Sequence, residues 1–137
     1  MNHPTLPDYR LIEQLDFVDF YSNPSGDTLI ARFKESSVVD LGMAKESLEF
    51  IRRHKQNKRT YGITDARAKF LDFKGEARNY YRENMLRSET ILHAIVVSDF
   101  PTKLSANLYA RFEKPNIPTR VFTSLEDAIN WIEEARI

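Results

Sequence analysis

The sequence predicts a single α/β domain with a mostly parallel β-sheet, an N-terminal β-hairpin and about four helices. Short apolar runs with strand character alternate along the chain with apolar positions at three- and four-residue spacing, which is the helical period. The run from 91 to 97 is almost continuously apolar, as is typical of a strand covered on both faces of a parallel sheet. The predicted order is therefore β-β-α-β-α-β-α-β-α, with right-handed crossovers and one antiparallel strand from the hairpin.

The composition excludes several classes of protein. The chain has 137 residues with 20 Lys and Arg against 20 Asp and Glu, so its formal net charge is zero and no long-range field favours nucleic acid. The longest apolar runs are too short to cross a bilayer, and we expect no membrane insertion. The sequence contains no Cys, which excludes thiol catalysis and disulfide bonds. The amino terminus lacks a leader pattern, and we expect a cytoplasmic protein.

The first quarter of the chain predicts a tail followed by a hairpin. Residues 1–8 contain two prolines and are expected to be a flexible tail ahead of a single domain over 9–137. The apolar pattern over 9–21 predicts one strand whose later part is covered on both faces. A turn cluster at 22–27 and alternation over 29–33 predict the second strand of a β-hairpin.

The middle of the chain predicts helix, strand and helix. Apolar residues at three- and four-residue spacing within 38–58 form one helical stripe. The short β-prone segment 61–64 ends at Asp65 and is expected to be a central strand. A second helix is expected to begin after Asp72, which has the residue type of an N-cap, and to carry an apolar side along 77–85.

The last third predicts two strands and two helices. We expect the strand over 91–97 to lie at the centre of the sheet. Pro101 suits the first turn of a third helix, which ends before the next proline. A short last strand over 118–123 precedes a fourth helix, for which Ser124 and Asp127 have the spacing of a capping box.

Catalytic and cofactor-binding motifs are missing from the sequence. The three histidines, His3, His54 and His93, include no pair at metal-ligand spacing, and His93 is expected to be a buried neutral side chain hydrogen-bonded to a neighbour. The four glycines are scattered, so neither a dinucleotide fingerprint nor a phosphate loop is present. We predict no catalytic residue, no cofactor and no metal, and therefore a protein that is not an enzyme.

Two pairs of segments resemble a known family. They are TDAR at 64–67 with EARNYY at 76–81, and NLYARFEKPNIPTRVFT at 107–123 with EDAINWI at 126–132. Both pairs are similar to the small bacterial STAS-like (SpoIIAA-like) proteins, often called STAS/SEC14-domain proteins. The second pair is the more specific, and the resemblance extends from Asp8 to Ile137.

The resemblance implies a fold and two kinds of ligand. It implies a single α/β domain with a mostly parallel sheet. In the anti-sigma-factor antagonists of this group, a kinase partner phosphorylates a Ser or Thr at the start of the helix after the central strand, and the added charge breaks partner binding. Here the matching stretch, 65–76, contains no hydroxyl residue, and Thr64 directly precedes it. The SEC14 connection implies a lipid or another apolar ligand.

The leading functional hypothesis is a non-catalytic cytoplasmic binding or regulatory domain of the STAS-like type, with a protein partner. Its predicted contact surface follows the central strand and consists of Asp65, Arg67, Phe70 and Phe73. Exposed aromatic residues beside charges are common anchors at interfaces, although both rings could instead turn inward and close the core. A homodimer formed through the outer strand of the opening hairpin is a further hypothesis.

Two alternatives stay open. One is a small apolar or lipid-like ligand held between the helices and the sheet, near Tyr81, Met85, Leu108 and Phe112. The other is an enzyme whose site is assembled from several loops without a linear motif. Three arginines are expected to mark the functional edge, with Arg67 at the carboxyl end of the sheet and Arg111 and Arg120 at the opposite end.

Overall fold

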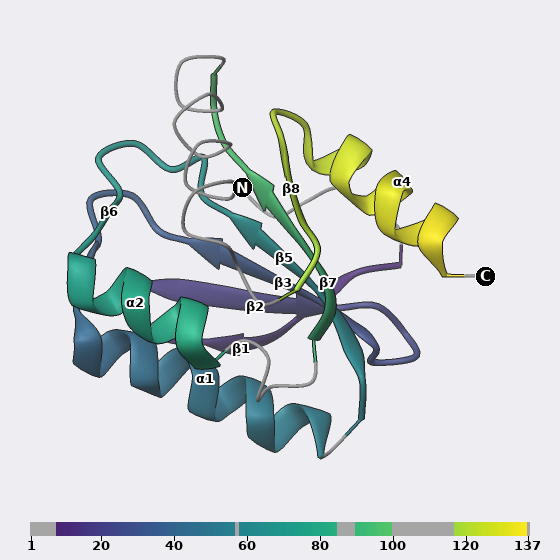
Figure 1. Cartoon of the computed structure of the whole chain (residues 1–137), viewed down its shortest axis with the longest axis horizontal. Coiled ribbons are helices and arrows are strands. Elements are labelled where there is room, and N and C mark those ends of the chain that lie inside the picture. The colour runs from purple at the N-terminus through teal and green to yellow at the C-terminus, as the bar shows by residue number, and fades with distance from the viewer. Residues whose placement is uncertain (1–7, 57, 85–89, 100–116, 137) are drawn as a thin grey trace.

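The computed structural model describes residues 8–56, 58–84, 90–99 and 117–136, and Figure 1 labels its elements apart from β4. A six-stranded sheet has the order β1-β2-β3-β5-β7-β8. Its strands are β1 (Arg10–Gln14), β2 (Val18–Ser22), β3 (Thr28–Phe33), β5 (Thr60–Asp65), β7 (Thr90–Val96) and β8 (Thr119–Phe122). Two short strands, β4 (Val38–Val39) and β6 (Asp72–Phe73), form a separate parallel pair, here called the small β4–β6 sheet. The helices are α1 (Leu41–Lys55), α2 (Gly75–Asn84) and α4 (Leu125–Ala135).

The sheet is mostly parallel, as the sequence predicts. β3, β5, β7 and β8 pair in parallel, whereas β1 pairs with β2 and β2 with β3 in antiparallel fashion. The single strand predicted over 9–21 is wrong, because this segment forms two strands, β1 and β2. A backbone hydrogen bond of 2.9 Å from Leu15 to Val18 closes a tight turn between them. The change of apolar parity near Phe17 reflects this turn. The later strand, β2, is covered on both faces as predicted, because Phe20 belongs to the core under α1 and α2 and Tyr21 to the core under α4.

The run over 91–97 forms β7, but its expected position at the centre of the sheet is wrong. β7 is next to the edge strand β8, and β3 and β5 are central because two antiparallel strands extend the sheet beyond β3. The run is nonetheless apolar for the expected reason, since both of its faces are covered. Ala94 and Val96 belong to the core cluster under α4, while His93 and Ile95 face the side of α1 and α2.

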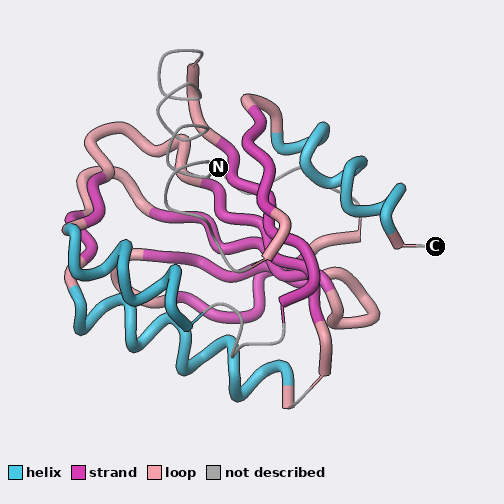
Figure 2. The backbone as a smooth tube through the Cα atoms, in the orientation of Figure 1, coloured by secondary structure: helices cyan, strands magenta, loops and turns pink. Residues whose placement is uncertain are grey.

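The helices form one layer on each side of the sheet. α1 and α2 lie side by side on one face, and α4 covers the other, as Figures 1 and 2 show. The first layer encloses a cluster that includes Phe20, Phe33 and Ala44, and the second encloses Ile63 and Ile132. Two cores of this kind bury both faces of the parallel strands, which accounts for their low polarity.

The helix starts agree with the sequence in one case and differ in another. Ser124 caps α4, accepting a hydrogen bond of 3.2 Å from the backbone of Asp127, so the predicted cap is confirmed. Asp72 is not the N-cap of α2, because it lies in β6 and its carboxylate accepts from the backbone of Phe73 at 2.9 Å. α2 begins only at Gly75. The third helix predicted from Pro101 lies outside the described residues, as do residues 1–7 of the predicted tail. The described residues contain three of the about four helices that the sequence predicts.

Candidate functional site

The carboxyl ends of β3, β5 and β7 lie at one edge of the sheet because these strands run parallel. The loops after β3 and β5 are tied together there by the small β4–β6 sheet. Backbone N–H groups donate from Ser36 to Lys69 at 2.9 Å and from Asp72 to Ser37 at 3.0 Å. Ligands of open α/β sheets usually bind outside this edge, so the candidate site is built here.

A buried carboxylate lies at the centre of this edge. Asp65 is the last residue of β5, and only 2% of its surface is exposed. Arg67, two residues later, donates to it from Nε and from Nη2, each at 2.8 Å, in a bidentate ion pair. The hydrogen bonds that Arg67 donates to the Asp65 carboxylate raise the pKa of Arg67. The pair compensates a charge that would otherwise be costly to bury, and it fixes the start of the loop after β5.

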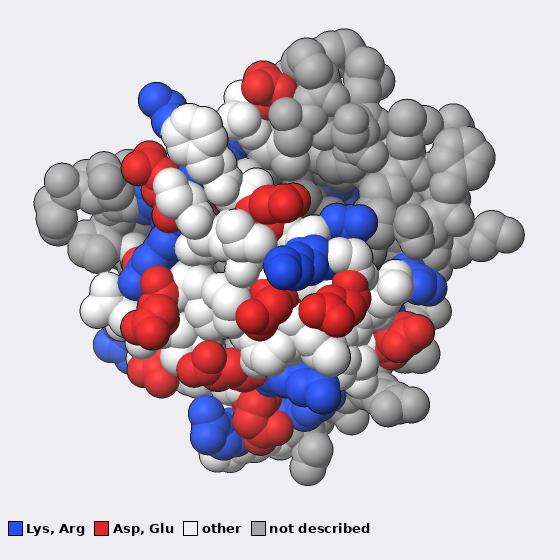
Figure 3. Space-filling view, turned by 90° about the vertical axis from the view of Figure 1, so that its left-hand side faces the viewer, with Lys and Arg blue, Asp and Glu red and all other residues white. Residues whose placement is uncertain are grey.

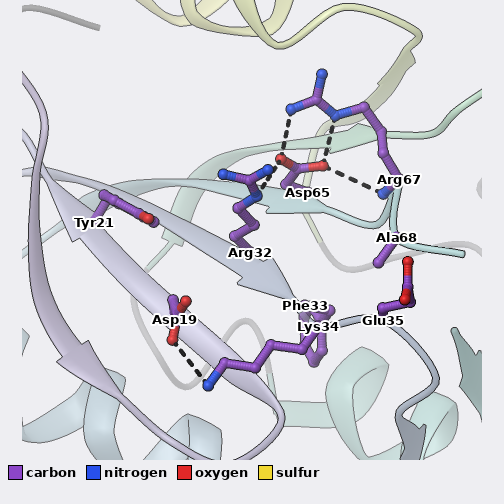
Figure 4. Close-up of a pocket in the computed structure, with 9 residues that line it drawn as sticks. All are labelled: Asp19, Tyr21, Arg32, Phe33, Lys34, Glu35, Asp65, Arg67 and Ala68. Carbon is purple, nitrogen blue, oxygen red and sulfur yellow. Dashed lines mark hydrogen bonds and ion pairs between the residues drawn. The ribbon is translucent and has the colours of Figure 1, made fainter. Parts of the chain in front are cut away.

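Beside Asp65 lies a cavity of about 490 Å³ that opens to solvent. Figure 4 shows its lining, which comprises Asp19, Tyr21, Arg32, Phe33, Lys34, Glu35, Asp65, Arg67 and Ala68. Lys34 Nζ lies 3.3 Å from Asp19 Oδ1 and donates to the carbonyl of Leu15 at 2.9 Å. Arg32 Nε lies 3.9 Å from Asp65 Oδ2. Three cations and three carboxylates therefore line one hollow at the carboxyl end of the sheet.

The two phenylalanines of the predicted surface behave differently. Phe70 is 81% exposed and has a positive φ of 60°, a conformation that is unusual for an aromatic residue. Phe73 lies in β6 and turns inward. The centre of its ring is 4.9 Å from the centre of the Phe33 ring and 6.1 Å from the centre of the Tyr81 ring. Of the four predicted residues, Asp65 and Arg67 are thus in direct contact, Phe70 projects outward and Phe73 belongs to the core.

Of the two arginines expected to mark a second edge, Arg120 is described and does not line this cavity. Arg120 lies on β8, where its guanidinium carbon is 5.3 Å from the centre of the Phe122 ring. It lines a separate shallow hollow with Trp131 and Glu134. Arg111 lies outside the described residues.

An apolar groove lies between the sheet and the layer of α1 and α2. It has a volume of about 500 Å³, and its lining includes Leu48, Ile51, Tyr81, Ile95 and Val97. Of the four residues that the sequence predicts beside an apolar ligand, Tyr81 lines this groove, and Met85, Leu108 and Phe112 lie outside the described residues. Burial raises the pKa of Tyr81 to about 12, and its hydroxyl lies 2.7 Å from Ser47 Oγ.

His93 lies in the wall of the same groove. Its Nε2 is 2.8 Å from Thr64 Oγ1, and burial lowers the pKa of His93 to about 4. The ring is therefore neutral at pH 7 and can accept the proton of the Thr64 hydroxyl. This confirms the prediction of a neutral histidine hydrogen-bonded to a neighbour.

The described residues bring together no group of three His, Asp or Glu side chains that could hold a metal ion. None of the helices within 8–56, 58–84, 90–99 and 117–136 is both long and apolar enough to span a membrane.

Comparison with known families identifies the group to which the chain belongs. The family described as "Domain of unknown function (DUF7793)" matches residues 24–136. The chain belongs to this family. No curated protein matches the chain.

This member of the family is also similar to a solved structure. It is the crystal structure of an uncharacterized protein from the DUF3478 family of Shewanella loihica PV-4, which is described as having a SpoIIAA-like fold. The similarity has a TM-score of 0.59 at 12% sequence identity and covers 90% of each chain. At this identity the likeness shows the fold alone. The STAS-like, SpoIIAA-like fold implied by the sequence is therefore confirmed.

The sequence did not single out Arg32, Lys34 or Asp19 as site residues. Arg32 stands out in the sequence only as the charged residue between Ala31 and Phe33, which is the ordinary alternation of a strand. Its role at the cavity depends on strand register, which places it opposite Asp19 on one side and Asp65 on the other.

Proposed function

We propose that this chain is a non-catalytic binding domain of the STAS-like type that contacts a protein partner through Phe70 and the loop 66–73. The observation that carries the proposal is the exposed ring of Phe70 on a backbone held in place. The preceding residue, Lys69, accepts a hydrogen bond from Ser36, and β6 follows two residues later. A large apolar side chain displayed at positive φ is costly to the free protein, and such strain is typical of functional sites.

The surroundings of Phe70 define the partner's chemistry. Lys69 is exposed beside the ring, and Arg67 is 37% exposed although it is paired with Asp65. Figure 3 shows basic and acidic side chains interspersed over the face that includes the small β4–β6 sheet, without separation into areas of one sign. Recognition then depends on shape. The partner is expected to offer an apolar pocket for the Phe70 ring, with acidic groups at its rim for the neighbouring cations.

Capture experiments with matched variants test this proposal. The wild-type chain, Phe70→Ala and Arg53→Ala are each used as bait in lysate of the native host. Arg53 is exposed on α1, away from the loop. A protein retained by the wild type and by Arg53→Ala but lost by Phe70→Ala supports the proposal. Equal retention by all three baits, with unchanged thermal midpoints, would contradict it.

A second candidate function rests on the apolar groove. Its volume of about 500 Å³ is in the range of small-molecule sites, and Tyr81 and Ser47 supply hydroxyl groups within a largely apolar lining. We propose a monoanionic or neutral apolar molecule as the ligand of this second function. Native mass spectrometry with added oleate tests it, using Ile95→Trp, a half-buried lining residue whose larger ring fills the groove, as the blocked variant and Arg53→Ala as the control. Oleate binding that Ile95→Trp abolishes while circular dichroism shows it folded supports the function, and a wild-type chain that never carries oleate contradicts it.

The homodimer hypothesis involves β1. This strand is one edge of the sheet, and Leu11 on it is exposed. An unpaired edge strand can pair with the same strand of a second copy. Sedimentation that finds only a 16.0 kDa species at micromolar concentration would contradict the hypothesis.

A further inference from the structure

The cations of the cavity at the carboxyl end of the sheet are not equally compensated. Arg67 is held by Asp65 through two short hydrogen bonds, and Lys34 is held by Asp19 together with the Leu15 carbonyl. Arg32 has an ion-pair contact at 3.9 Å with Asp65, and the structure shows no hydrogen bond from its guanidinium to any of the described residues. The guanidinium of Arg32 thus has N–H groups that donate no hydrogen bond to the described residues.

Strand register determines where those donors are directed. Asp19, Arg32 and Asp65 lie in register on three adjacent strands and share one face of the sheet. The Nε atom of Arg32 is the one nearest Asp65, and Figure 4 shows its guanidinium at the cavity between Tyr21 and Asp65. The two terminal nitrogens are therefore available to the cavity. A guanidinium edge of this kind matches the two oxygens of a carboxylate.

We propose that this cavity binds the carboxylate group of a small molecule, with Arg32 as the principal donor. The cavity shares Arg67 and Ala68 with the loop 66–73, but its ligand is a small molecule and its principal donor, Arg32, lies on β3, so the proposal does not depend on the partner. The cavity of about 490 Å³ has room for a metabolite-sized ligand.

The remaining charges limit the ligand to a low net charge. Two of the three carboxylates in the lining, Asp19 and Asp65, are paired, and the third belongs to Glu35, an exposed residue. All three repel an added anion, so a doubly charged group such as phosphate gains less than a single carboxylate. The ligand is therefore a monocarboxylate, or a zwitterion whose ammonium group can approach Glu35.

Acetate is the probe for the test. Sodium acetate is titrated into the ¹⁵N-labelled full chain at constant ionic strength, with chloride as the balancing anion, and amide and Arg Nε–H signals are followed. The expected result is saturable shifts at Arg32 and its neighbours. Arg32→Gln should weaken acetate binding at least about tenfold. Arg32→Lys should weaken it less, because Lys keeps the positive charge but lacks the two parallel N–H groups of the guanidinium. Arg53→Gln, which removes the same charge elsewhere, should bind acetate as the wild type does.

Three outcomes would overturn the proposal. They are shifts that stay linear in acetate, equal saturation in Arg32→Gln and the wild type, or tighter binding of phosphate than of acetate. Circular dichroism of each variant checks that it is folded. Phe70→Ala should bind acetate normally whether or not it loses the protein partner, so failure of this proposal and failure of the proposed function are distinguishable.

Discussion

The buried ion pair of Asp65 and Arg67 should respond asymmetrically to the loss of either partner. Arg67→Ala leaves the carboxylate of Asp65 buried, with Arg32 at 3.9 Å as its nearest cation among the described residues. Removing one partner of a fully buried pair costs about 3–5 kcal/mol. The Arg67 side chain is 37% exposed, so water can enter the vacated space, and we expect a smaller cost of about 2 kcal/mol.

Asp65→Asn should cost less than Arg67→Ala. The amide of Asn keeps one acceptor oxygen, and the guanidinium of Arg67 can turn towards solvent instead of staying unpaired in the interior. We expect a loss of about 1 kcal/mol. The double variant contains no buried uncompensated charge, so its stability should be close to that of Asp65→Asn alone, and the coupling between the two sites should be about 2 kcal/mol.

Urea denaturation of the four proteins measures these differences. Trp131 reports on the core under α4, because its ring is 5.6 Å from that of Phe122, and far-ultraviolet circular dichroism reports on the helices. The two probes should give coincident transitions with similar m-values. The reasoning is refuted if Asp65→Asn is destabilised as much as Arg67→Ala, or if the losses in the double variant simply add.

Three further predictions concern stability. Ser124→Ala should lower the free energy of unfolding by about 1 kcal/mol because it removes the N-cap of α4, whereas Ser124→Thr should lose little. A difference between Ser124→Ala and the wild type of less than a few tenths of a kcal/mol in urea denaturation would contradict this. Leu48→Ala should cost about 2–5 kcal/mol, since this side chain lies on α1 and is fully buried on the side of the sheet, and a loss below about 1 kcal/mol would contradict this. Burial lowers the pKa of His93 to about 4, so the unfolded chain binds its proton first as the pH falls, and up to about 3 kcal/mol of stability should be lost between pH 6.5 and pH 4. This acid sensitivity should be absent from His93→Gln, and an identical pH profile for both proteins would contradict the assignment.

The long elements could be predicted because their periodicity is local. The apolar stripe within 38–58 is the buried side of α1, and the near-continuous run at 91–97 is β7. The capping of α4 by Ser124 depends on two residues three apart, which the sequence shows directly. Features of this kind need no information about distant parts of the chain.

Features that depend on long-range pairing could not be predicted. β4 and β6 have two residues each and exist because the loops after β3 and β5 meet in space. The position of Asp72 illustrates the effect, since pairing in β6 draws this residue away from the helix start that its side chain would otherwise favour. The central position of β3 and β5 likewise follows from where β1 and β2 pair.

The candidate site also combines local features that the sequence predicts with long-range features that it does not. Asp65 and Arg67 are two residues apart, and their proximity follows from the sequence once β5 is known to end at Asp65. Phe70 and Phe73 are chemically identical and only three residues apart, so composition cannot tell the outward ring from the inward one. The positive φ at Phe70 and the packing of Phe73 on Phe33 decide this, and both are tertiary effects. The carboxylates that lie beside the Arg32 guanidinium are set by the register of β2, β3 and β5, which the sequence does not show.

The central claim is that the Phe70 ring is the anchor for a protein partner, and a binding measurement with the purified partner tests it most directly. The Kd of the captured protein is measured by calorimetry for the wild type, Phe70→Ala and Arg53→Ala at one salt concentration. Truncation of a hot-spot aromatic residue costs about 2 kcal/mol or more, so we expect the Kd of Phe70→Ala to rise about 30-fold while that of Arg53→Ala stays within twofold. A Kd for Phe70→Ala within about threefold of the wild type, with the fold intact, would contradict the claim.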